Sequence, residues 1–205
     1  ATHGYPLDTS SSSGSITVTN ASNVTYIVGG LVGRFFGNGS DTAPSTKIRN
    51  SYSTVDISTT NRGDGFAGGL VGLAQYNAGI LNCYASGDVY SQRGDIGGLV
   101  GGEYVDVINS FYVGNLSFDS GYFDLLTQPR NVYYLENNYT YDGSIITSDN
   151  GLVTPTADIF GVVMTASADE YNNAYDFYTR VLGWSEYFFN FEGLDIVNGV
   201  LPTHK

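Results

Sequence analysis

The segment Gly-Gly-Leu-Val-Gly occurs three times in this chain of 205 residues, at residues 29–33, 68–72 and 97–101. The copies begin 39 and then 29 residues apart, so the length between them varies while the segment does not. Identical segments at such spacing are typical of repeat architectures, in which each unit buries its apolar face against the next. This repeat limits the possible folds more than any other feature of the sequence.

A second motif lies between these segments and reads apolar, any residue, Asn, small, aromatic. It is present at residues 48–52, 80–84 and 107–111, and its Asn residues are Asn50, Asn82 and Asn109. Six residues after each Asn stands a second polar residue that precedes an apolar one: Asp56, Asp88 and Asn115. Each unit therefore contains three short β-prone stretches separated by Gly, Asn and Asp turns, which is typical of a β-solenoid rung.

We expect an all-β fold, a β-solenoid (parallel β-helix) of about four rungs. The Leu and Val of each Gly-Gly-Leu-Val-Gly segment would form a core ladder with a step of about 4.8 Å per rung. The three Asn side chains would stack on one another at a corner and satisfy its buried polar groups. Residues 15–25 fit the same frame as a first copy, with Thr17 in the Asn column and Asn23 in the Asp column.

The repeat divides the chain into three parts. We expect a flexible polar leader at 1–14, the solenoid at 15–121 and a C-terminal part at 122–205 with strands, one helix and a capping segment. The helix would begin with a capping box of Ser167 and Glu170 and end near Gly183. An aromatic run would cover the open solenoid end or, as an alternative, stack on carbohydrate: Trp184, Tyr187, Phe188, Phe189 and Phe191.

The charge balance excludes some classes of partner. Eight Lys and Arg against twenty Asp and Glu give a net charge of −12, which repels nucleic acid and anionic lipid. Apolar runs are far shorter than the roughly 20 residues that span a bilayer, so no membrane insertion is expected. The single cysteine, Cys83, excludes an intramolecular disulfide framework. It shares its column with Ser51 and Ser110, which predicts a small buried residue and not a nucleophile.

The sequence contains no recognisable catalytic set. His3 and His204 lie near opposite ends of the chain, without the motif of a zinc or triad enzyme, so we expect no enzymatic activity. Asp56 and Asp88 would lie on adjacent rungs. Such a pair can cap turn amides, bind a calcium ion or act as a glycosidase pair, and these alternatives stay open. Calcium is the one cofactor that the sequence suggests.

Two further motifs suggest surface interactions. Arg62-Gly63-Asp64 and Arg93-Gly94-Asp95 each precede a Gly-Gly-Leu-Val-Gly segment; the tripeptide is known from integrin recognition, but Gly-Asp is also ordinary turn sequence. Five Asn residues lie in sequons for N-glycosylation: Asn20, Asn23, Asn38, Asn115 and Asn138. Binding through Arg62, Asp64, Arg93 and Asp95, and sugar on the five Asn, are therefore expectations to be examined.

The repeats resemble the GLUG-motif repeats of bacterial surface proteins, in which a GGLVG-like stretch alternates with an I-x-N-C/S-Y stretch followed by Gly-Asp-Val. The segment ILNCYASGDV at 80–89 carries this resemblance most closely. It extends over about 16–116, and a second part runs from 131–135 to 182–205. The resemblance implies an extracellular repeat fold, found in adhesin-like proteins and beside the catalytic domain of streptococcal IgA-cleaving metalloproteases, and it implies no catalytic residues.

These observations favour a structural or adhesive protein at the cell surface or outside the cell, as a mature secreted chain. It would present a rigid surface and self-associate into a filament or layer, or bind other surface proteins or glycans. The alternative is a carbohydrate-binding or carbohydrate-active solenoid that uses the Asp56 and Asp88 line.

Overall fold

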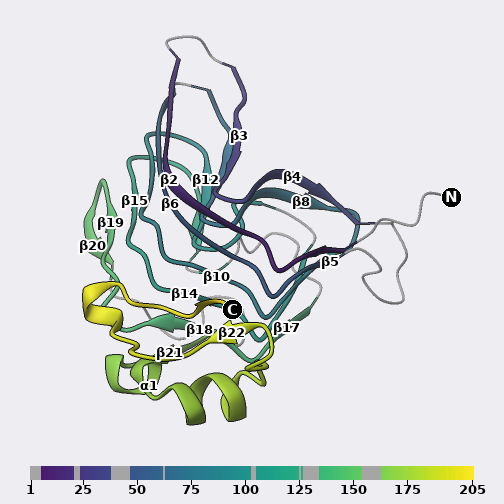
Figure 1. Ribbon diagram of the computed structural model, residues 1–205. Coiled ribbons are helices and arrows are strands. Elements are labelled where there is room, and N and C mark those ends of the chain that lie inside the picture. Colours follow the sequence, from purple (N-terminus) through teal and green to yellow (C-terminus); the bar gives the residue numbers. More distant parts are fainter. Residues whose placement is uncertain are drawn as a thin grey trace, which may run out of the picture.

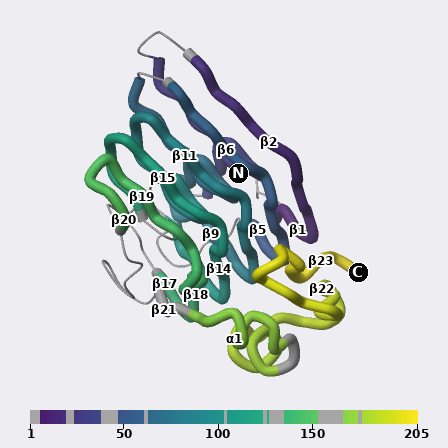
Figure 2. Tube along the Cα trace, turned by 90° about the vertical axis from the view of Figure 1, so that its left-hand side faces the viewer, coloured from purple at the N-terminus to yellow at the C-terminus, as the bar shows by residue number. Residues whose placement is uncertain are grey.

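The computed structural model describes residues 6–20, 24–37, 47–61, 63–102, 105–124, 126, 134–153 and 163–205. About half of these residues form short strands, and most strands pair in parallel with the equivalent strand of the next repeat (Figure 1). The repeats follow one another as successive loops of one coil (Figure 2). The fold is thus mostly β, with parallel sheets stacked as solenoid rungs.

Sheet A forms one side of the coil. Its strands stand in the order β1 (Leu7–Asp8), β5 (Lys47–Arg49), β9 (Ala78–Leu81), β13 (Val105–Ile108) and β17 (Tyr134–Glu136). Because this sheet holds one strand per rung, it shows five levels where about four were expected.

Sheet B is bent and begins with two long strands, β2 (Ser11–Asn20) and β6 (Tyr52–Asn61). One arm continues through β10 (Tyr84–Ala85), β14 (Phe111–Tyr112), β18 (Asn138–Tyr141) and β21 (Val163–Ala166). The other continues through β11 (Val89–Ser91), β15 (Leu116–Phe118), β19 (Ile146–Ser148) and the antiparallel β20 (Gly151–Val153). Side chains alternate along β6, where Ser53, Val55, Ile57 and Thr59 face the interior and are buried.

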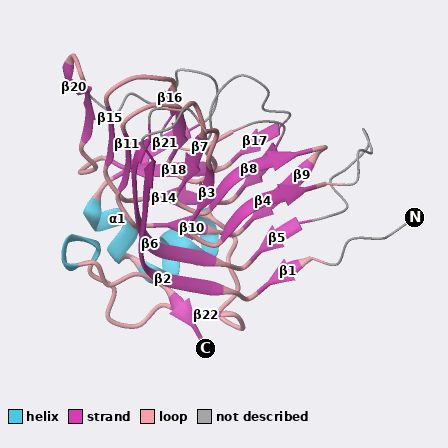
Figure 3. Cartoon of the chain, turned by 90° about the horizontal axis from the view of Figure 1, so that it is seen from above, coloured by secondary structure: helices cyan, strands magenta, loops and turns pink. Residues whose placement is uncertain are grey.

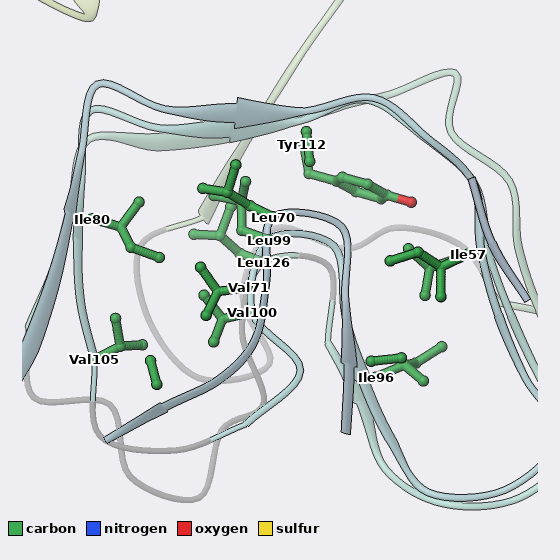
Figure 4. Close-up of a cluster of buried hydrophobic side chains, with 14 of the residues drawn as sticks. Ile57, Leu70, Val71, Ile80, Ile96, Leu99, Val100, Val105, Tyr112 and Leu126 are labelled. Atoms are coloured by element: carbon green, nitrogen blue, oxygen red, sulfur yellow. The ribbon is translucent and has the colours of Figure 1, made fainter. Parts of the chain in front are cut away.

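Sheets C and D form the remaining sides of the coil, sheet D, within the described ranges, in the first two rungs only. Sheet C consists of β3 (Ile27–Gly29), β7 (Phe66–Gly68), β12 (Asp95–Gly97) and β16 (Phe123–Asp124), and sheet D of β4 (Val32–Phe36) and β8 (Val71–Gln75). The Gly-Gly-Leu-Val-Gly segment forms the turn between them and folds inward, so Leu70, Leu99 and Leu126 stack in the centre of the core (Figure 4). Gly68 is required there because a β-carbon would collide with the carbonyl oxygen of Val71.

The solenoid is longer than the predicted range of 15–121. Parallel pairing begins at Leu7, opposite Ile48, and still joins Ser117 to Thr147. Residues 7–8 and 11–14 lie in strands, so the prediction of a flexible leader over 1–14 is wrong for them. They were missed because the first rung is longer than the others: the offset from Leu7 to Ile48 is 41 residues, against 27 from Ile80 to Val107.

The predicted frame of the first copy is also wrong. Thr17 pairs with Ser58, and Ser15 pairs with Asp56, so Ser15 and not Asn23 stands in the Asp column. The residue in the Asn column is Thr9, which directly follows the pairing of Asp8 with Arg49. Asn23 lies outside the described residues.

The C-terminal part contains the expected capping box. Ser167 accepts a hydrogen bond from the Glu170 amide, and the Glu170 carboxylate accepts one from the Ser167 amide, at the start of α1 (Ala168–Asn172). The expected single helix is divided at Asn173, where the π-helix η2 (Ala174–Val181) takes over and ends before Gly183. The chain then forms β22 (Phe189–Asn190), the 3-10 helix η3 (Ile196–Asn198) and β23 (Thr203–His204). Among the described residues, no helix is long and apolar enough to cross a membrane.

Residues 167–205, which we call the cap, lie beside the solenoid and not across its open end, as Figures 1 and 3 show. The cap covers the outer side of β6, β10, β14 and β18, where one ring per rung forms an aromatic face: Tyr52, Tyr84, Phe111 and Tyr139. The prediction that the aromatic run covers the end cross-section is therefore wrong. The row of stacked rings on the flank is the apolar surface that the cap buries.

Candidate functional site

The predicted Asn ladder is present. Asn82 donates from Nδ2 to the Oδ1 of Asn50 at 3.2 Å, and Asn109 donates likewise to Asn82 at 3.4 Å. These residues have φ of 48° to 53°, a left-handed conformation that Asn tolerates better than most residues. The motif therefore specifies the backbone of the corner between sheets A and B as well as the side-chain stack.

Sequence reasoning missed both ends of this ladder. Asn137 donates to the Oδ1 of Asn109 at 2.9 Å, and Asn50 donates to the Oδ1 of Asp8 at 2.9 Å. Every amide donates toward the N-terminal rung, so the ladder ends on a carboxylate, which accepts but does not donate. Although partial burial opposes it, the hydrogen bonds from Asn50 and Arg49 lower the pKa of Asp8.

Cys83 lies in the interior, as predicted. It is fully buried, and its thiol donates to the carbonyl of Leu81 at 3.2 Å, as the hydroxyl of Ser110 donates to Ile108 at 2.8 Å. Burial raises the pKa of Cys83 to about 12. A thiol that stays protonated makes a poor nucleophile or metal ligand.

The Asp column forms a second ladder, on the outer side of sheet B. The Oδ1 of Asp56 accepts the amide of Asp88 at 2.9 Å, and the Oδ1 of Asp88 accepts the amide of Asn115 at 2.8 Å. The Oδ1 of Asn115 accepts the amide of Ile145 at 2.8 Å. Each side chain thus satisfies the turn amide of the following rung, which is the capping alternative of the sequence analysis.

The described part of the structure adds nothing to the sequence-based prediction of a calcium ion at Asp56 and Asp88. In the described part of the chain, no group of three or more His, Cys, Asp or Glu is placed to hold a metal ion. Glycosidase chemistry at this pair also stays a prediction, to be tested by substituting Asp88. His204 contacts Tyr52 and the carbonyl of Asn50, and it forms no ion pair with a carboxylate of the described residues.

The two Arg-Gly-Asp tripeptides lie at stacked corners. The Nε of Arg93 lies 2.8 Å from the Oδ1 of Asp64, and both side chains are exposed, so one tripeptide forms an ion pair with the other. Asp95 is half-buried and accepts the amide of Tyr122 at 3.4 Å. Arg62 lies outside the described residues. These corners line a groove of about 590 Å³ with Phe66 and Tyr122 at its rim.

The sequons differ in accessibility. Asn138 is fully buried, with its amide donating to the carbonyl of Val107 at 2.7 Å, so the prediction of a sugar there is wrong for the folded chain. Asn115 is half-buried, and both polar atoms of its side chain are hydrogen-bonded within the ladder. Asn20 ends β2, while Asn23 and Asn38 lie outside the described residues.

The aromatic run of the cap is divided between interior and surface. Trp184 and Phe189 are buried, and the indole of Trp184 donates to the carbonyl of Asn109 at 2.8 Å. Tyr187 is 82% exposed. A carbohydrate platform needs exposed rings, so Trp184 and Phe189 are unsuited to that role.

Comparison with known proteins supports the repeat seen in the sequence and in the structure. Residues 67–90, which include one Gly-Gly-Leu-Val-Gly segment and one Asn motif, match the family model described as the GLUG motif. The chain contains a GLUG motif. The resemblance to GLUG-motif repeats seen in the sequence is thus confirmed for these residues.

Curated proteins to which this chain is similar include immunoglobulin A1 proteases of Streptococcus pneumoniae. One, from strain ATCC BAA-255 / R6, is 34% identical over an alignment of 129 residues, and the match covers 55% of this chain and 6% of the relative. A second is 38% identical over 95 residues, which are 45% of this chain and 5% of the relative. The chain therefore corresponds to a small part of much longer proteins.

A solved structure shares the fold of this chain. It is the crystal structure of a Bacteroides ovatus protein assigned as an immunoglobulin A1 protease, with a TM-score of 0.76 and 21% identity. The alignment covers 98% of this chain and 57% of that chain. Because it includes the cap as well as the rungs, solenoid and cap together form one arrangement that both chains share.

Proposed function

We propose that this GLUG-repeat domain is a non-enzymatic structural and adhesive module of an extracellular or cell-surface protein, which self-associates through its first rung. The single observation that carries the proposal is the unpaired edge of β2. This ten-residue strand pairs with β6 and with no other described strand. A long unpaired edge is a template for strand addition by another chain.

The side chains at this end support the proposal. In the first rung Ile16, Leu31 and Val32 are half-buried, whereas their counterparts one rung further along, Ile57, Leu70 and Val71, are buried. A second copy that pairs with the edge would cover them and gain about 25 cal/mol for each Å² of apolar surface. The resemblance to surface proteins, the net charge of −12 and the hydrogen-bonded ladders are consistent with a soluble, rigid module that presents its flanks.

The pairing pattern identifies a substitution that blocks the edge alone. The amide of Tyr52 donates to the carbonyl of Ser10. In a parallel pair the residues that bond the neighbour alternate, so Ser10, Ser12, Gly14, Ile16 and Val18 bond β6, while Thr17 directs its amide away from β6. Proline at position 17 would remove an outward amide and keep the pairing with β6.

Self-association is measured by light scattering across a range of protein concentrations and by negative-stain electron microscopy. We expect the wild-type chain and the control Thr17→Val to form dimers or longer particles, and Thr17→Pro to stay monomeric with an unchanged melting temperature. A wild-type chain that is monomeric at every concentration would refute the proposal. Particles that form equally well with Thr17→Pro would show that another surface is used.

A further inference from the structure

The groove between the Arg-Gly-Asp corners is built by three consecutive rungs. Asp95 pairs with Phe66, and Ile96 pairs with Phe123, which places Tyr122 opposite Asp95. The same register stacks Asp64, Arg93 and Ser120 in one column and Gly65, Gly94 and Gly121 in the column beside it. The groove is thus lined by equivalent positions one rung apart, about 4.8 Å between neighbours.

The glycine column makes this surface hollow. A β-carbon on Gly94 would lie 2.6 Å from the carbonyl oxygen of Gly65, and one on Gly121 would collide with the carbonyl of Gly94. Both glycines also have positive φ, 115° and 128°. Side chains are therefore excluded from the floor, and those on either side form two walls.

The walls project outward because of strand alternation. Ile96 points into the core (Figure 4), so Asp95, its neighbour on β12, faces the other side. Asp64 and Arg93 precede β7 and β12, and both side chains are exposed. One wall therefore consists of the exposed Asp64–Arg93 ion pair with Ser120, and the other of Phe66, Asp95 and Tyr122.

The chemistry of the two walls restricts the ligand. Tyr122 is 56% exposed and Phe66 is half-buried, and aromatic rings at a groove rim stack on the apolar face of a sugar. Carboxylates and a guanidinium in fixed positions hydrogen-bond adjacent hydroxyl groups. Two acidic groups against one basic group, in a chain of net charge −12, repel phosphate and other anions.

We propose that this groove is a binding site for neutral oligosaccharides, with Tyr122 as the stacking platform and Asp95 and Arg93 as hydrogen-bonding groups. The site is separate from the Asp56 and Asp88 line and from the edge of β2. It goes beyond the proposed self-association, and neither proposal depends on the other.

The test uses titration calorimetry with three neutral probes, N-acetyllactosamine, mannotriose and cellotriose, with sialyllactose as an anionic comparison. We expect at least one neutral probe to bind, and Tyr122→Ala and Asp95→Asn each to weaken it about tenfold. Ser120→Trp, which fills the groove without removing either group, should abolish binding. Matched controls are Tyr187→Ala, an exposed tyrosine on the cap, and Asp88→Asn, which should change the affinity less than twofold.

The proposal fails if none of the three neutral probes binds, or if binding survives Tyr122→Ala and Ser120→Trp. Loss of binding with Asp88→Asn would assign the sugar site to the Asp column instead. A lysine-rich peptide that binds through Asp64 and Asp95 while the sugars do not would identify a groove for cationic peptides and would also overturn the proposal. Thermal unfolding of each variant verifies that the fold is retained.

Discussion

The solenoid and the cap are held together in different ways. In the solenoid, equivalent residues of neighbouring rungs contact each other, so Asn50, Asn82 and Asn109 repeat one interaction. In the cap, contacts join residues far apart in the chain: Tyr84 donates to the carbonyl of Pro202 at 2.6 Å. Repetition specifies the solenoid locally, whereas the cap depends on an aromatic face that exists only once several rungs have stacked.

If the cap depends on the solenoid and not the reverse, removing a large side chain from the cap should destabilise the cap and leave the solenoid folded. Trp184 packs on Phe111, with ring centroids 5.3 Å apart, and is buried. Trp184→Ala should cost about 3–5 kcal/mol. We expect the aromatic near-ultraviolet circular dichroism to be lost at a lower temperature than the far-ultraviolet β signal. Coincident loss of both signals would show that cap and solenoid unfold as one unit.

The ladder should be most sensitive in its middle. Asn82→Ala removes two amide hydrogen bonds and places alanine at a φ of 53°, which together should cost about 2–4 kcal/mol in urea denaturation. Asn82→Gly is the matched control, because it restores the backbone freedom but not the amide. A smaller loss with Gly than with Ala would separate the two contributions. Equal losses would mean that the left-handed corner carries no cost.

The end of the ladder should respond to pH. The pKa of Asp8 is lowered in the folded chain, so its stabilising contribution is complete above the ordinary Asp pKa of about 3.9 and is lost as the pH falls through the folded value. Asp8→Ala should lower the unfolding free energy by about 0.5–1.5 kcal/mol at pH 7. Below the folded pKa of Asp8 the variant and the wild type should converge. A difference that persists at low pH would refute the role of the carboxylate charge.

Substitution and alkylation of Cys83 test whether its position is a structural column or a reactive site. Cys83→Ser reproduces the residue of neighbouring rungs and should change the stability by less than about 1 kcal/mol. Because burial raises the thiol pKa to about 12, native protein should resist alkylation by iodoacetamide at pH 8 and react after unfolding. Rapid labelling of the native chain would contradict the buried ladder position.

The smallest expected effect is that of chelation. The Asp56 and Asp88 carboxylates each accept an amide of the next rung, so a chelator should leave the melting temperature unchanged. Asp88→Asn, which keeps an acceptor oxygen, should be almost neutral. A melting temperature that falls with chelator and recovers with calcium would restore the calcium site.

The rungs were predictable from the sequence where the motif residues are present, and not where other residues occupy the same positions. Asn137 was missed although Leu135 and Tyr139 occupy the apolar and aromatic positions around it, because Asn138 replaces the small residue and no Gly-Gly-Leu-Val-Gly segment accompanies it. Thr9 was missed because the first rung is longer than the others, so no constant offset leads to it. In both places the rungs still stack, because the hydrogen bonds between parallel strands join backbone groups and do not require a particular side chain. A motif in the sequence, in contrast, is recognised only by its side chains.

The amino-acid sequence by itself determined the parallel stacking, the inward Leu and Val turns and the Asn corner, because equivalent residues in neighbouring rungs must meet equivalent environments. It also determined the capping box of α1, which depends on residues three apart. Only the tertiary structure decided that the cap lies on the flank, that Asn138 is buried and that the Arg-Gly-Asp corners form a groove. These features depend on distances between rungs and between distant segments, which no local pattern of residues contains.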